Sequence, residues 1–212
     1  HNVYAMWKYA QAGLAEPAEV LDQASSVIGR PPPDTYLQAN PHVHNAWIAG
    51  YVGYVELAKM AGRPFAEEQK ELDRLLRLRV ETFRWDVEAD TGSRQSDQYF
   101  YTLITAWNFM FLVPELSDHL RQNALEKVQD AVDRYTRMAP YWMAGHNKEV
   151  QHENGITPYH QTHALFQAKA QVLQASREEL ANVLDTPLVP AGDLFYIQNL
   201  IATLEASPAS SP

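Results

Sequence analysis

The chain has 212 residues, of which 46% are hydrophobic and 11% aromatic, and its formal net charge is −9. This composition predicts a folded globular protein, and the negative charge argues against non-specific nucleic-acid binding, although a local basic cleft could still take an acidic ligand. The absence of cysteine excludes disulfides and thiolate catalysis, and no apolar stretch reaches the roughly 20 residues of a membrane span.

The N-terminal segments show helical patterns. Residues 2–14 carry apolar side chains at helical spacing, and residues 16–29 have a proline in their first turn and a glycine at their end. Residues 30–41, "RPPPDTYLQANP", are expected to form a stiff extended connector, because their prolines fix φ and remove backbone donors.

The next segments alternate between apolar and charged helices. Helices over residues 41–62 and 98–113 are apolar and aromatic and are expected to be buried, whereas those over 64–85 and 114–139 are amphipathic and are expected to face solvent. Strand signals, such as sustained alternation or Asn-Gly and Asp-Gly hairpin turns between strands, are nearly absent.

The C-terminal part contains three further predicted helices, over residues 162–174, 176–185 and 191–206. Residues 1–206 are therefore predicted to form a single helical-hairpin domain, and residues 207–212, rich in Ser, Pro and Ala, a linker or disordered tail. We expect the chain to be a mature product or a piece of a larger protein.

The alternation predicts an all-α fold of stacked antiparallel αα-hairpins, with about 40–45 residues for each pair of helices. The pair His1-Asn2 recurs as His44-Asn45 after 43 residues, each followed two positions later by an aromatic residue. This offset fits one hairpin unit. The hairpins could form an open solenoid or close into an α/α toroid, which in a chain of this length would be incomplete.

The segment "NPHVHNAW", residues 40–47, resembles the helix-start motif of Asn or His followed by Trp in α/α-toroid polysaccharide lyases and glycosidases of the alginate-lyase-like and heparinase II/III-like kinds. Together with the aromatic inner and charged outer helices, this resemblance implies a carbohydrate-active helical domain. It implies cleavage of an acidic polysaccharide by β-elimination, with hydrolysis as a variant, or binding of that polysaccharide.

The start of the helix over 41–62 is the first candidate site, with His42, His44, Asn45, Trp47 and Tyr51. The resemblance implies catalytic roles for His44 and Asn45, which would steady a substrate carboxylate and help to move a proton. The other three residues are predicted to bind substrate, the two aromatics by stacking on sugar rings. The alternative is that the aromatics pack in the core and the histidines satisfy carbonyls at helix ends.

A second candidate site lies in the His-rich segment over residues 140–161 and the start of the helix that follows. A loop this rich in His, Asn and Glu is costly to bury and therefore favours function. We predict catalytic roles for His152, Tyr159 and His160, and substrate binding by His146, Glu153 and His163. Tyr99 and Tyr101 flank the start of the helix over 98–113, and one of them is expected to line the same cavity as Tyr51. Tyr99 is predicted to bind substrate.

No cofactor is predicted, but a divalent metal held by imidazoles of this His-rich segment is an alternative, as is a solvated loop with helix caps. At the level of the whole chain, the alternative to a lyase or glycoside hydrolase is a non-catalytic helical-repeat scaffold or binding module of a larger extracellular protein. In both interpretations we expect an extracellular or periplasmic location.

Overall fold

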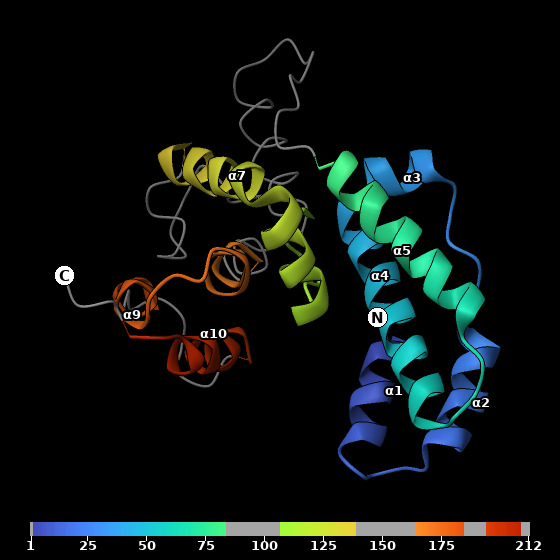
Figure 1. Cartoon of the computed structure of the whole chain (residues 1–212). Coiled ribbons are helices and arrows are strands. Elements are labelled where there is room, and N and C mark those ends of the chain that lie inside the picture. Colours follow the sequence, from blue (N-terminus) through green and yellow to red (C-terminus); the bar gives the residue numbers. More distant parts are fainter. Residues whose placement is uncertain (1, 84–106, 139–163, 185–193, 209–212) are drawn as a thin grey trace, which may run out of the picture. The chain divides into compact units, whose positions relative to one another are not determined.

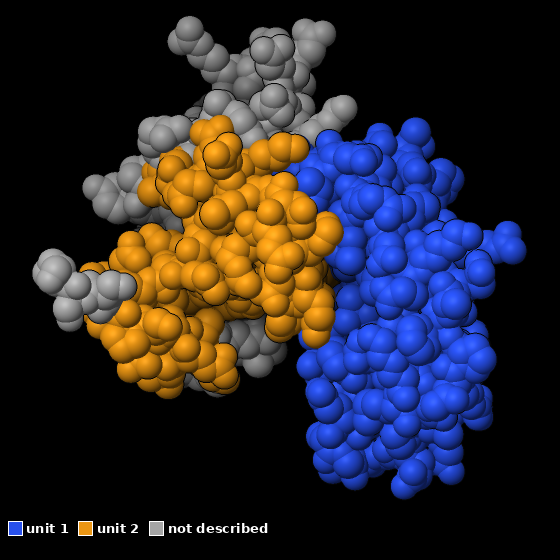
Figure 2. All heavy atoms as spheres, in the orientation of Figure 1, with its two compact units in different colours: residues 1–83 blue, residues 84–212 orange. Residues whose placement is uncertain are grey.

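The computed structural model describes residues 2–83, 107–138, 164–184 and 194–208 (Figure 1). Every regular element in these ranges is helical, which confirms the prediction of an all-α fold. Within the same ranges, no helix is both long and apolar enough to span a membrane. Contacts divide the chain into two compact units, residues 1–83 and 84–212 (Figure 2). A compact unit need not be an independent domain, so the single domain over 1–206 stays a prediction.

Unit 1 is organised around one long helix. Its helices are α1 (Asn2–Gln11), α2 (Pro17–Val27), α3 (Asp34–Ala39), α4 (Pro41–Met60) and α5 (Ala66–Glu81). Helix α4 contacts each of the other four, and its buried positions include Ile48, Ala49, Val52 and Val55 on several sides of the helix. The prediction that this segment is a buried helix is confirmed.

The predicted extended connector is partly wrong, because α3 forms inside it. The run of three prolines ends at Pro33. The backbone N–H groups of Tyr36 and Leu37 both donate to the carbonyl of Pro33. A proline restricts the residue before it and its own φ, but it does not prevent a helix that begins directly after it. Leu37 is fully buried, so packing against α4 supports this short helix.

Helices α1 and α4 approach each other so closely at Gly53 that their backbones touch. A β-carbon at Gly53 would lie 2.6 Å from both the Cα of Tyr4 and the carbonyl oxygen of Val3. Such distances are far below a normal van der Waals contact, and both atoms belong to backbone, which cannot rotate away. Gly53 is therefore required at this crossing.

Replacing Gly53 with Ala is expected to destabilise unit 1 by about 2–4 kcal/mol, because the clash outweighs the gain of up to about 1 kcal/mol in helix propensity. Urea unfolding followed by circular dichroism measures the change. Gly62→Ala is the control: Gly62 has φ of +63° and open space around it, so it should cost only about 1 kcal/mol. A Gly53→Ala variant more stable than the parent chain would contradict the close crossing.

Gly62 ends α4 through its left-handed backbone. The N–H of Arg63 donates to the carbonyl of Ala58 at 2.9 Å, and the N–H of Gly62 donates to that of Lys59 at 3.1 Å. These two bonds form a Schellman motif, which satisfies carbonyls that the helix end leaves open. Arg63 also pairs with Asp22 of α2, so the turn after α4 is tied to a neighbouring helix.

Helix α5 has the amphipathic character predicted for residues 64–85. Leu72, Leu75 and Leu78 are buried. On the same helix the half-buried Arg74 bridges two carboxylates, Asp34 at 2.6 Å and Glu71 at 2.7 Å. The first of these pairs joins α5 to α3.

Unit 2 contains the helices α7 (Pro114–Met138), η2 (Ala168–Val172), α9 (Arg177–Leu184) and α10 (Leu194–Glu205) in its described residues. The helix predicted over 98–113 does not continue to its expected end, since residues 108–111 form a turn in which Phe111 has φ of +60°. Pro114 disfavours a helical residue before it and instead begins α7.

The helix predicted over 162–174 is α-helical at residues 164–167 and then widens into the π-helix η2. Its side chains belong to a chain of polar groups within unit 2. Ser117 Oγ donates to Gln171 Oε1 at 2.9 Å, Gln171 Nε2 to Gln167 Oε1 at 2.5 Å, and Gln167 Nε2 to Asn199 Oδ1 at 3.0 Å. This chain connects α7, the helix over 164–172 and α10.

Local capping fixes α9 and the end of α10. Ser176 and Glu179 form a capping box: the N–H of Glu179 donates to Ser176 Oγ at 3.2 Å, and the N–H of Ser176 donates to Glu179 Oε2 at 2.9 Å. These bonds lower the pKa of the Glu179 carboxyl. Arg177 donates to the carbonyls of Leu204 and Ala206 at the end of α10. Its own N–H reaches the carbonyl of Ser207, the first residue of the predicted tail.

Candidate functional site

The start of α4 carries the candidate residues that the structure describes. Asn40 occupies the N-cap position and Pro41 the first helical position. The Asn40 side chain does not cap α4, since its Nδ2 donates backwards to the carbonyl of Tyr36 at 2.9 Å. The Asn40 side chain is therefore bonded to α3 and not to α4. The contacts of α4 near its start are made by the side chains of its first two turns.

His44 is fully buried against α5. Its Nε2 lies 3.0 Å from the carbonyl oxygen of Leu75, to which it donates. Within the part of the chain that the structure describes, no hydrogen-bond partner reaches Nδ1 of His44. Burial, followed by the nearby positive charge of Arg79, lowers the pKa of His44 to about 4. The imidazole is therefore neutral at pH 7 and protonated on Nε2.

Asn45 is also fully buried and accepts a hydrogen bond from α5, with Arg79 Nε 2.8 Å from its Oδ1. The guanidinium carbon of Arg79 lies 5.0 Å from the centre of the Phe83 ring, within the range of a cation–π contact. Arg79 is only 1% exposed, and burial lowers its pKa to about 9. It therefore keeps its charge at neutral pH inside unit 1.

Arg79 is the residue of this site that the sequence analysis missed. Its signal was present, because Arg79 follows Leu75 by four residues and Leu72 by seven, which places all three on one face of α5. A charged residue at that spacing inside an apolar stripe indicates a buried polar contact. The charged character of the whole segment concealed it.

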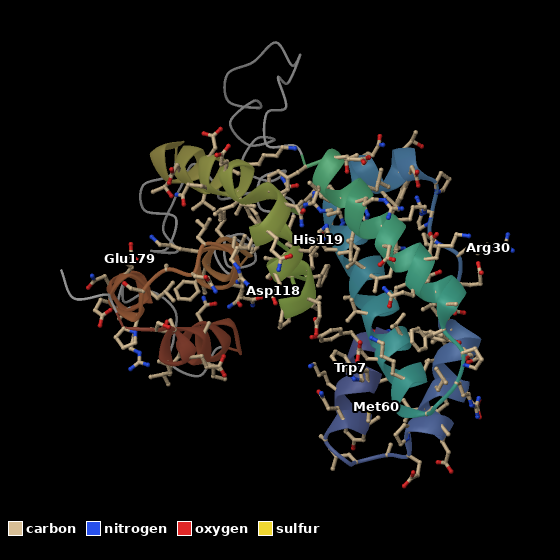
Figure 3. The ribbon with its side chains drawn as sticks, viewed as in Figure 1. Trp7, Arg30, Met60, Asp118, His119 and Glu179 are labelled. Atoms are coloured by element: carbon tan, nitrogen blue, oxygen red, sulfur yellow. The ribbon has the colours of Figure 1, made fainter. Side chains whose placement is uncertain are left out.

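The aromatic pair of the site faces the connector between α2 and α3. The ring centres of Trp47 and Tyr51 lie 6.3 Å apart at an angle of 38°. Tyr51 is buried, and its hydroxyl donates to the carbonyl of Gly29 at 3.3 Å. Trp47 is half-buried, with its indole beside Gly29. The next residue, Arg30, is exposed and projects away from the helices (Figure 3).

The electrostatic surroundings of Tyr51 are mixed. Burial raises its pKa, and the carboxylates of Glu71 and Glu68 add to this effect, while the positive charges of Arg74 and Arg30 oppose it. The surface near the aromatic pair thus contains both signs of charge. His42 is half-buried on the same helix, and burial lowers the pKa of its imidazole.

The other predicted site residues lie outside the described residues: Tyr99, His146, His152, Glu153, Tyr159, His160 and His163. Their predicted roles in catalysis and substrate binding stay predictions, as does the alternative metal site. Among the described residues, no group of three or more His, Asp or Glu side chains is arranged to hold a metal ion.

Comparison of the chain with protein families, with curated proteins and with solved structures found no match. The chemical interpretation of the site therefore depends on its geometry. His44 and Asn45 each form a hydrogen bond that joins α4 to α5, and both side chains are fully buried. Trp47, His42 and Arg30 keep surface that a ligand could contact.

The buried Asn45–Arg79 contact is expected to be a major stabilising feature of unit 1. Arg79→Met should lower the free energy of unfolding by about 3 kcal/mol, because Asn45 loses its charged donor and stays buried. Arg77→Met, on the exposed side of the same helix, should change it by less than about 0.5 kcal/mol.

A double-mutant cycle between Asn45→Leu and Arg79→Met isolates the contact itself. Urea unfolding of the two single variants and the double variant should give a coupling free energy above about 1 kcal/mol. Additive effects of the two substitutions would show that Asn45 and Arg79 do not depend on each other.

Proposed function

We propose that the chain is a helical carbohydrate-binding module for an acidic polysaccharide, and that its first unit binds the polymer without cleaving it. The observation that carries this proposal is the burial of His44 and Asn45, whose polar groups hydrogen-bond to α5. Fully buried side chains that hydrogen-bond to a neighbouring helix are poorly placed to act as acid, base or carboxylate-binding groups. This favours binding over β-elimination at the start of α4.

The half-buried indole of Trp47 and the exposed guanidinium of Arg30 are the groups proposed to contact the ligand. An aromatic face stacks on the apolar side of a sugar ring, and a guanidinium pairs with a carboxylate or sulfate. Both are close to Gly29, because Trp47 packs beside it and Arg30 follows it in sequence. The positive charge of Arg30, the residue after Gly29, is the reason to propose an acidic polysaccharide.

The pairing of a buried α4 with a charged α5 supports the further proposal of an α/α-toroid-like arrangement of inner and outer helices. An extracellular or periplasmic location belongs to the same proposal, since acidic polysaccharides occur there. A lyase remains the second candidate, and it would depend on the His-rich segment over residues 140–163.

Titration of the full chain with uronate oligosaccharides, followed by heteronuclear NMR, tests the binding. Trp47→Ala should weaken the affinity about tenfold, the magnitude expected for one stacking contact, and Arg30→Gln should weaken it and reduce its salt dependence. Tyr36→Ala is the matched control, since Tyr36 is an aromatic residue of α3 that is 50% exposed, and it should leave the affinity unchanged.

Absorbance near 235 nm distinguishes binding from β-elimination, because only the elimination produces an unsaturated uronate. We expect no increase with the wild-type chain. An increase would contradict the proposal in favour of the lyase. Failure of all oligosaccharides of a broad panel to bind would instead favour the non-catalytic scaffold.

A further inference from the structure

Two hydrogen bonds between α4 and α5, His44 to Leu75 and Asn45 to Arg79, form a polar contact inside unit 1. We propose that this contact is an acid-sensitive switch: protonation of His44 breaks the α4–α5 polar contact and opens unit 1 locally. The proposal does not depend on the proposed carbohydrate binding.

Protonation of His44 would add a proton at Nδ1. The bond to Leu75 favours the charged ring, but burial and the positive charge of Arg79 outweigh it. Nε2 already donates to the carbonyl of Leu75, a backbone group of α5. A proton on Nδ1 would enter a fully buried position that no acceptor reaches within the described part of the chain. A buried donor without an acceptor carries its full desolvation penalty.

The charges that act on His44 come from two helices packed against α4. Arg79 and Arg74 of α5 disfavour a second positive charge, and Asp34 of α3 favours it more weakly. The other two helices contact α4 further along, α1 at Gly53 and α2 through the Ser25–Tyr54 hydrogen bond at 3.1 Å. Since Arg79 is itself buried, an imidazolium beside it would place two cations in one interior.

The sign of the pH dependence follows from the lowered pKa. In the unfolded or opened state His44 has its ordinary pKa of 6.5, whereas in the closed state the value is about 4. The opened state therefore binds the proton first as the pH falls. The contribution of neutral His44 to the stability of the closed state is fully present above pH 6.5. It decreases progressively as the pH falls toward 4. Between pH 7.5 and 5.5 the linkage relation gives about a tenfold increase in opening.

Hydrogen–deuterium exchange of the full chain, read by mass spectrometry and corrected for the intrinsic effect of pH, measures this opening. Peptides that cover α4 and α5 should lose protection about tenfold between pH 7.5 and 5.5. This window lies above the ordinary titration range of carboxylates. In His44→Gln, which keeps an amide donor for the Leu75 carbonyl, protection should change less than twofold over the same range.

His42→Gln is the matched control on the same helix, because His42 is only half-buried, whereas His44 is fully buried. It should keep most of the pH dependence of the wild-type chain. The proposal is overturned if the pH dependence disappears in His42→Gln and persists in His44→Gln, or if wild-type α4 and α5 show none.

An NMR titration of the wild-type imidazoles tests the same proposal without a variant, so it decides the matter even if His44→Gln does not fold. The His44 ring protons should remain those of a neutral imidazole at pH 5.5 in the closed chain. Titration of His44 with a midpoint near 6.5 in the folded chain would overturn the proposal.

Discussion

The hydrogen bond between the buried side chains of Asn45 and Arg79 is the constraint on which the first unit depends. A guanidinium in an apolar interior is tolerated only where its donors and its charge are compensated. Here the compensation comes from an amide on α4 and an aromatic ring at the end of α5. The two helices therefore cannot slide past each other without breaking a charged contact, which fixes their register more sharply than leucine packing alone.

This constraint also explains why a polar motif at a helix start is ambiguous. His44 and Asn45 stand next to each other in sequence, as the polar residues of a catalytic helix start would, and both are instead directed at α5. A polar residue can serve a substrate or a neighbouring helix, and the same atoms rarely serve both. Trp47, three residues after His44, differs from both because it retains partial exposure, whereas Tyr51 is buried.

Much of the fold could be predicted from the sequence because helical periodicity and helix-end residues are local signals. Helix α4, the amphipathic α5 and the end of α4 at Gly62 all follow from such patterns. Helix α3 could not be predicted from the prolines before it, because its stability depends on burial of Leu37 against α4. The π-helical turn was equally hidden, since its polar partners lie on α7 and α10.

The polar chain in the second unit has a direction. From Ser117 through Gln171 and Gln167 to Asn199, every donor points the same way, and each amide fixes the orientation of the next. Reversal of one amide would set two oxygens or two NH2 groups against each other, so the group can only invert collectively. The orientation of a hydroxyl on one helix is thereby correlated with that of an amide on another, across three elements of the unit.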